Sequence, residues 1–141
     1  MKRPNRPRNT ASQLAVGSGV LLLALTGCTG QGNAENHNAG SAAVAYASSA
    51  KSSPTAACDL LAPETRKELE STDGPCASSL PQQVDSAGGS VRDVQVYGKD
   101  AVVHLSDDTV FLARFRDGWR VTAASCTPQG DRPYDCRIKG D

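Results

Sequence analysis

Five cysteines carry the most definite chemistry in this 141-residue chain, because a thiolate can be acylated, oxidised to a disulfide or bound to a metal ion. They are Cys28, Cys58, Cys76, Cys126 and Cys136. No two of them form a C-x-x-C pair, and the separations of 18 residues from Cys58 to Cys76 and 10 residues from Cys126 to Cys136 are unlike zinc-ligand spacing. We therefore expect no metal and no cofactor. An odd count in an exported protein requires a separate role for one cysteine.

Cys28 follows an N-terminal segment with the anatomy of a signal peptide. Its positive residues are Lys2, Arg3, Arg6 and Arg8. The apolar run Leu14 to Leu25 comes next, and its 12 residues fall short of the roughly 20 that a membrane-spanning helix needs. The motif Leu25-Thr26-Gly27-Cys28 resembles the lipobox of bacterial lipoproteins. The resemblance implies that residues 1–27 are a signal peptide and that Cys28 is lipidated.

Lipidation of Cys28 leaves four cysteines for an oxidising compartment, where two disulfides leave no free thiol. Four cysteines allow three pairings. We favour Cys58 with Cys76 and Cys126 with Cys136, because both bonds close local loops. The expected location is the extracytoplasmic face of the cell membrane, with the acylated cysteine inserted in the lipid bilayer.

Removal of the leader changes the charge of the chain. The whole sequence has 15 basic and 15 acidic residues, but four basic and no acidic residues precede Cys28. The mature chain then has 11 basic and 15 acidic residues, a net charge of about −4. This balance disfavours a nucleic-acid partner and an electrostatic grip on anionic lipid. Attachment is expected to come from acyl chains, since two chains anchor a protein stably.

Residues 29–53 consist mostly of Gly, Ala, Ser, Asn and Gln. With Cys28 they are predicted to form a flexible tether, residues 28–53, with a root-mean-square reach of about 25 to 30 Å. Val44 and Tyr46 look too isolated to start a core, and His37 has no other metal ligand nearby.

Residues 54–141 predict one small α+β domain. Residues 55–71 indicate an N-terminal helix in one or two pieces, with a break at Ala62-Pro63. The strand candidates are residues 91–97, 100–106, 109–116 and 119–125. Two-residue turns separate them, and Asp117-Gly118 is the strongest hairpin signal. The expected fold is a helix packed on a four-stranded antiparallel meander, with two disulfides.

These turns assign the two faces of the sheet. The expected core face contains Val94, Val96, Ala101, Val103, Leu105, Val110, Leu112, Trp119, Val121 and Ala123. The other face contains Asp93, Gln95, Tyr97, Val102, His104, Phe111, Ala113, Phe115, Arg120 and Thr122. A bulge in one hairpin would exchange the faces of the strands beyond it.

His104 opposite Asp93, with Phe111 beside it, is the best candidate for catalytic chemistry. An aspartate that orients an imidazole is half of a general-base arrangement. The alternative is an ordinary cross-strand polar pair on the surface. No nucleophile elbow, phosphate loop or acidic cluster at ligand spacing accompanies the pair, so we predict that the protein is not an enzyme.

Two groups of residues are candidates for binding. Arg114, Arg116 and Arg120 could receive an anionic ligand such as a carboxylate or a cell-wall phosphate, or they are solvated arginines balanced by Asp117. An exposed apolar patch for a partner or a second copy is the other candidate, unless a helix or the C-terminal loop covers it. Its residues are Tyr97, Val102, Phe111 and Phe115.

Most of residues 54–141 resembles a group of small, uncharacterised actinobacterial lipoproteins. The segments that carry the resemblance are Cys58-Asp59-Leu60-Leu61, Pro63-Glu64-Thr65-Arg66, Cys76, Phe111-Leu112, Asp117-Gly118-Trp119-Arg120-Val121, Cys126 and Pro133-Tyr134-Asp135-Cys136. More loosely, a helix followed by a meander ending in Gly-Trp is similar to the cystatin-like, nuclear-transport-factor-two-like superfamily, in which helices pack on a curved sheet. These resemblances imply fold and location and assign no chemistry to residues.

The leading hypothesis is a membrane-anchored lipoprotein that acts as a non-enzymatic binding or accessory module on an envelope protein or cell-wall component. The alternative is a small-molecule-binding or hydrolytic protein with a pocket between helix and sheet. A purely structural envelope protein is a third hypothesis.

Overall fold

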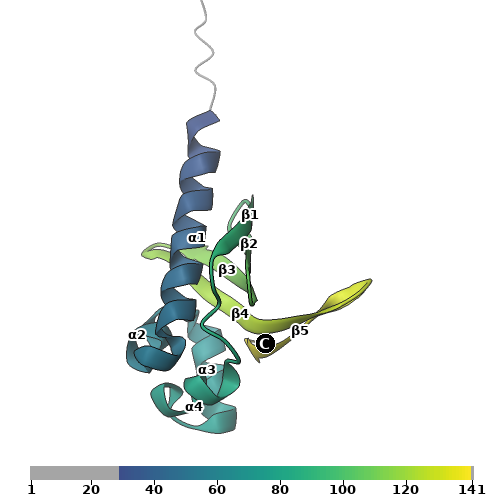
Figure 1. The fold of residues 1–141 in the computed structure, drawn as a ribbon. Helices are drawn as coiled ribbons and strands as arrows, with labels where there is room; N and C mark the ends of the chain where they lie inside the picture. The colour runs from purple at the N-terminus through teal and green to yellow at the C-terminus, as the bar shows by residue number, and fades with distance from the viewer. Residues whose placement is uncertain (1–28, 141) are drawn as a thin grey trace, which may run out of the picture.

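The structure, a computed structural model, describes residues 29–140. These residues form four helices and one antiparallel sheet of five strands, so the predicted α+β class is confirmed, but the sheet has one more strand than predicted. The helices are α1 (Thr29–Ser52), α2 (Pro54–Asp59), α3 (Pro63–Asp73) and α4 (Cys76–Gln83). The strands are β1 (Val91–Tyr97), β2 (Asp100–Leu105), β3 (Thr109–Phe115), β4 (Gly118–Gln129) and β5 (Arg132–Lys139). Figure 1 shows the long α1 lying along the sheet, with α2, α3 and α4 grouped at its C-terminal end.

The segment predicted to be a flexible tether is helix α1, so that prediction is wrong. The helix forms because alanine is the best helix former and loses no side-chain entropy on folding. One side of the helix is buried against the sheet and the helices. Its buried residues include Ala39, Ala43, Tyr46, Ala47 and Ala50, which follow the helical repeat. Tyr46, which looked too isolated to enter a core, is among the largest fully buried side chains.

Small residues let α1 approach its neighbours closely. A Cβ added at Gly40 would lie 3.3 Å from Val94 Cγ2 on β1. At the other end of the helix, Gly88 has a φ of +79° and passes so close to α1 that an added Cβ would lie 2.3 Å from the Ala47 Cβ. Larger residues at either position would push α1 away from the sheet or the loop that precedes β1.

The predicted break at Ala62-Pro63 is confirmed, since α2 ends before it and α3 begins at Pro63. The segment between the two helices pairs with β4: Ala62 N donates to Val121 O at 2.7 Å, and Val121 N donates to Leu60 O at 2.8 Å. This pairing ties the small helices to β4.

The strand order is β1-β2-β3-β4-β5, a simple meander. Most of the predicted core face is buried: Ala101, Val103, Leu105, Val110, Leu112, Trp119 and Val121. A register shift opposite Phe111 and Leu112 lies between Val121 and Ala123. Beyond it Ala124, and not the predicted Ala123, is buried, because a bulge reverses the side-chain alternation.

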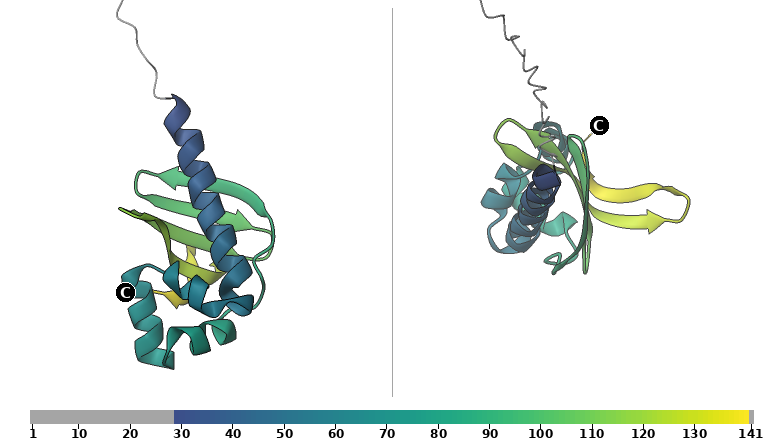
Figure 2. Two further views of the ribbon diagram at one scale, coloured as in Figure 1. Left: turned by 90° about the vertical axis from the view of Figure 1, so that its left-hand side faces the viewer. Right: turned by 90° about the horizontal axis from the view of Figure 1, so that it is seen from above.

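At the C-terminus, the sequence interpretation predicted the first part of β4 as residues 119–125 but missed its continuation and all of β5. β4 continues to Gln129, and β5 returns beside it with Cys126 opposite Cys136. Proline is tolerated in both strands because Pro133 lies in the edge strand β5, and Pro128 lies in the part of β4 beyond its pairing with β3. The tip of this hairpin projects away from the rest of the domain (Figures 1 and 2).

Both predicted disulfides are confirmed. Cys58–Cys76 joins α2 to α4, and Cys126–Cys136 crosses the β4–β5 hairpin. Each closes a short loop, with sequence separations of 18 and 10 between the paired cysteines. In residues 29–140, no helix is both long and apolar enough to cross a membrane.

Candidate functional site

The structure places Asp93 opposite His104 in the β1–β2 register, as predicted, but does not join their side chains. His104 Nδ1 lies 3.2 Å from Thr109 Oγ1 on the neighbouring β3. The Asp93 carboxylate instead accepts a hydrogen bond of 2.7 Å from Gln95 Nε2 on its own strand. The imidazole is therefore oriented by a hydroxyl group, and the geometry lacks the carboxylate–imidazole contact of a general-base pair.

The predicted apolar patch is divided by the fifth strand. Phe111 packs edge-on against Tyr134 of β5, with ring centroids 5.4 Å apart and an interplanar angle of 70°. Phe111 and Val102 are half-buried, whereas Tyr97 and Phe115 are 62% and 40% exposed. The two exposed aromatic residues come from the ends of different strands.

The three candidate arginines have different surroundings. Arg114 forms an ion pair of 3.1 Å with Glu35 of α1, and the same carboxylate accepts a 3.1 Å hydrogen bond from Trp119 Nε1. Arg116 is exposed beside them, where it lines a hollow of about 300 Å³ between α1 and the β3–β4 hairpin. Glu35 was missed because its segment was interpreted as a tether. The available signal was that Glu35 is the sole acidic residue of residues 29–53.

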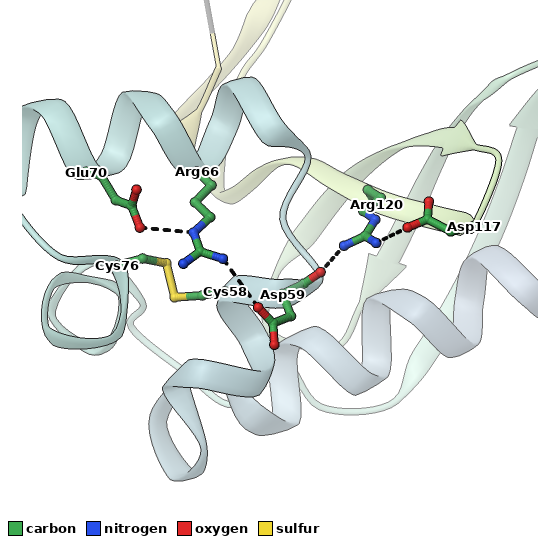
Figure 3. A network of polar contacts seen from close by, with 7 residues as sticks. All are labelled: Cys58, Asp59, Arg66, Glu70, Cys76, Asp117 and Arg120. Atoms are coloured by element: carbon green, nitrogen blue, oxygen red, sulfur yellow. Dashed lines mark hydrogen bonds and ion pairs between the residues drawn. A yellow bond between two sulfur atoms is a disulfide. The ribbon is translucent and has the colours of Figure 1, made fainter.

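Arg120 lines a second cleft, and Figure 3 shows its polar contacts. Its guanidinium forms an ion pair with Asp117 and donates to the backbone carbonyl of Asp59. The hydrogen bond from Arg120 lowers the pKa of Asp117. The guanidinium is thus already engaged by a carboxylate and a carbonyl, which leaves it poorly suited to recruit an anion.

Arg66 lies on the other side of the same cleft (Figure 3). It contacts Glu70 at 2.9 Å and Asp59 at 3.3 Å, and the hydrogen bond to Glu70 raises the pKa of the guanidinium. The cleft has a volume of about 550 Å³ and its lining includes the exposed Phe115. Its cations and carboxylates alternate, so it provides no excess positive charge for an anionic ligand.

An apolar groove between α1 and β1 is the site that the sequence interpretation missed. It has a volume of about 600 Å³. Its lining residues are Asn36, His37, Gly40, Ser41, Val44, Ala45, Val91 and Val94. Gly40 brings the helix close to the strand, and Val44 and Val91 remain 36% and 42% exposed on either side. These are two of the four large hydrophobic residues that are exposed in residues 29–140.

The strand beside this groove is an edge of the sheet. Within the described residues, β1 pairs with β2 on one side alone. The Val94 carbonyl accepts a hydrogen bond from Asn36 Nδ2 at 3.4 Å, which is long for such a bond. The groove therefore combines apolar side chains with a strand edge and a weakly satisfied backbone acceptor.

A cluster of carboxylates lies at the opposite end of the sheet from the β1–β2 turn. Asp85, Asp107, Asp108 and Asp135 line a hollow there together with Arg137, which pairs with Asp85. Asp108 has a structural role: it accepts hydrogen bonds from the backbone N–H groups of Ser125 and Cys126 at 2.9 and 3.0 Å. In the described part of the chain, no group of three or more His, Cys, Asp or Glu residues is placed to hold a metal ion.

The predicted lipidation site, Cys28, lies outside the described residues, which begin at the next position. Comparison with protein-family models, with curated proteins and with solved structures finds no match to this chain. The likeness to small actinobacterial lipoproteins and to the cystatin-like superfamily therefore stays a prediction.

Proposed function

We propose that this protein is an extracytoplasmic lipoprotein, anchored in the cell membrane through Cys28, that acts as a non-enzymatic binding module. Its partner is an envelope protein, and the binding site is the groove between α1 and β1. The observation that carries the proposal is the apolar lining of this groove beside a free strand edge.

The chemistry of the groove favours an extended protein segment as its ligand. A strand that adds to a sheet edge gains backbone hydrogen bonds along the edge and specificity from pockets for alternate side chains. The backbone of β1 offers the edge, and the Val94 carbonyl can exchange its long contact with Asn36 for a backbone N–H donor. An apolar side chain of the partner would cover Val44 and Val91, and full burial of one such side chain contributes about 1.5 to 3 kcal/mol.

The cysteines support the extracytoplasmic location. Cys58, Cys76, Cys126 and Cys136 are all in disulfides, which persist in oxidising compartments. The parity argument then assigns the fifth cysteine, Cys28, to lipidation. The partner of His104, a threonine hydroxyl, supports the non-enzymatic part of the proposal.

Site-specific photocrosslinking in the native membrane tests the protein partner. A photoreactive residue at position 44 should form an adduct with one envelope protein, and Val91→Asp should abolish it. The matched control is the same residue at position 71, which is exposed on α3 away from the groove. A peptide from the crosslinked segment should then shift the NMR signals of the β1 amides. Equal adducts at positions 44 and 71, or no shift of β1 signals, would contradict the proposal.

A small apolar molecule is the second candidate ligand, because the groove volume of about 600 Å³ is within the range of small-molecule sites, roughly 300 to 1,000 Å³. Organic extraction of the purified protein and mass spectrometry would reveal such a ligand. Recovery of a stoichiometric apolar compound that Val44→Asp eliminates would favour this candidate over the protein partner.

A further inference from the structure

Two turns of the meander lie next to each other at one end of the sheet. Gly98 and Lys99 connect β1 to β2, and Arg116 and Asp117 connect β3 to β4. In an antiparallel meander these two connections share an end, and the backbone N–H of Arg114 donates to Lys99 O at 2.7 Å. We name this surface the turn end and define it by Tyr97, Lys99, Phe115 and Arg116. In the left view of Figure 2, the tips of these hairpins lie on the same side, at the ends of the strands.

The side chains of the turn end combine aromatic rings with positive charge. Tyr97 and Phe115 are 62% and 40% exposed and are the two exposed aromatic side chains in the described part of the chain. Lys99 and Arg116 are exposed, and neither forms an ion pair with another described residue. Aromatic residues with cationic neighbours suit the interface between water and lipid, where the rings reach the headgroups and the cations meet phosphates.

The carboxylates around the turn end are mostly neutralised. Glu35 is paired with Arg114, and Asp117 is paired with Arg120, which leaves Asp100 as an exposed acidic neighbour. The turn end and its surroundings therefore have one more cation than carboxylate. The cations are Lys99, Arg114, Arg116 and Arg120, and the carboxylates are Glu35, Asp100 and Asp117.

At the far end of the sheet the charge has the opposite sign. Four aspartates, Asp85, Asp107, Asp108 and Asp135, line one hollow with a single arginine. The fold thus places positive charge at one end of the sheet and negative charge at the other, although the net charge of the mature chain is about −4. An anionic surface attracts the turn end.

The turn end also lies beside the start of α1. Glu35 joins α1 to Arg114 and Trp119 next to the β3–β4 turn. From Thr29 to Glu35 an α-helix rises about 9 Å. A lipid on Cys28, directly before Thr29, would therefore hold the turn end close to the bilayer.

We propose that the turn end docks on anionic lipid headgroups. Lys99 and Arg116 contact lipid phosphates, while the rings of Tyr97 and Phe115 enter the headgroup layer. The proposal rests on the proposed anchoring of Cys28 and adds a defined orientation to it. Docking fixes the domain against the membrane and leaves the acidic far end facing away.

The test uses the acylated protein purified from membranes and reconstituted in nanodiscs that carry a gadolinium chelate on a fraction of the headgroups. In discs with phosphatidylglycerol, the amide NMR signals of Gly98, Lys99 and Gly118 should be lost. Signals of Asp107 and Gly130, at the far end and on the projecting hairpin, should persist. Discs of phosphatidylcholine alone, or high salt, should restore the turn-end signals, because screening weakens contacts between exposed charges.

Charge reversal distinguishes docking from mere proximity. Lys99→Glu with Arg116→Glu should restore the turn-end signals in anionic discs, and Tyr97→Ser with Phe115→Ser should restore them in part. The matched control, Arg132→Glu with Lys139→Glu, should leave the wild-type pattern. Uniform broadening over both ends, or a pattern indifferent to Lys99→Glu with Arg116→Glu, would overturn docking while anchoring stands. A protein that is not retained on the discs would overturn the anchoring and the docking together.

Discussion

Tyr46 is the residue whose burial has the clearest energetic consequence. It is 1% exposed, and its hydroxyl has no hydrogen-bond partner among the described residues. A hydroxyl buried in this way costs about 1 to 3 kcal/mol in lost hydration. Burial raises the pKa of Tyr46, and the negative charge of Asp108 raises it further.

Tyr46→Phe should therefore increase the free energy of unfolding by about 1 kcal/mol, since the ring stays and the unpaired hydroxyl goes. Urea unfolding at neutral pH measures the change. A decrease of similar size would show that the hydroxyl is hydrogen-bonded to a water molecule in solution.

The same residue predicts a loss of stability in alkali. The ordinary pKa of tyrosine is near 10.0, and the folded protein raises it. Ionisation of Tyr46 therefore leaves the free energy of unfolding unchanged below about pH 10 and lowers it as the pH rises above that value, because only the unfolded chain ionises. Between about pH 8 and about pH 11, the free energy of unfolding should decrease less steeply with pH for Tyr46→Phe than for the wild type. Tyr97→Phe, which removes an exposed hydroxyl, should behave like the wild type.

Glu35 joins α1 to the sheet through two side chains. Glu35→Gln should lower the free energy of unfolding by about 1 kcal/mol, because it removes the ion pair with Arg114 and weakens the bond from Trp119. Trp119 is the sole tryptophan, so its fluorescence reports the change directly. Glu64→Gln, which breaks an exposed pair with Lys67, is the control and should have almost no effect.

At the scale of elements, α1 is an integral part of the fold. It contacts β1, β2, β3 and β4 and covers the buried residues of the sheet. Deletion of residues 29–52 should abolish cooperative unfolding in urea, because the exposed core face would have no covering helix. Deletion of residues 29–33, which precede Glu35 and Asn36 and their bonds to the sheet, is the control and should preserve a cooperative transition. A cooperative transition after the longer deletion would show that residues 54–141 fold alone.

The strands could be predicted from sequence because their signals are local. Val94 and Val121 are each flanked by polar residues, and short turns separate the strands. The bulge after Val121 has no such local signal, since it depends on how β4 meets both β3 and β5. Pro133 is a residue that disfavours most strands, and a sequence does not reveal that β5 will lie at the edge of the sheet, where proline is tolerated.

Helix α1 was missed because its composition is typical of a linker, whereas the spacing of its buried residues is that of a helix. Gly, Ser and Asn are common in linkers, and the alanines that carry the buried stripe add little hydrophobicity. The repeat of Ala39, Ala43 and Ala50 with Tyr46 was the available signal. The groove was missed for the same reason, because six of its eight lining residues belong to this helix.

The candidate pair Asp93 and His104 shows a different limit. Their register followed from the hairpin, but the partners of their side chains depend on rotamers that Gln95 and Thr109 decide. The sequence predicted which residues are neighbours in the sheet, whereas the packing of their side chains determines which of them form hydrogen bonds.

At the scale of the whole molecule, Cys28→Ala should abolish lipidation. The intact mass of the wild type should correspond to a chain that starts at Cys28 and carries acyl groups, whereas the variant should show no acyl mass. Non-reducing peptide mapping should find Cys58–Cys76 and Cys126–Cys136 in both proteins, since these bonds lie within the domain. An unlipidated wild-type chain would contradict the proposed anchor.

The continuous helix from Thr29 to Ser52 also limits where a partner can be met. A coil of this length would let the domain search a hemisphere with a radius of about 25 to 30 Å above the membrane. A helix restricts the groove to a narrow range of distances from the membrane. The effective concentration of the groove is therefore higher for ligands held at that distance. With the proposed anchor at Cys28, the protein is therefore suited to encounters in two dimensions with neighbours fixed in the same membrane, and poorly suited to capture of freely diffusing molecules.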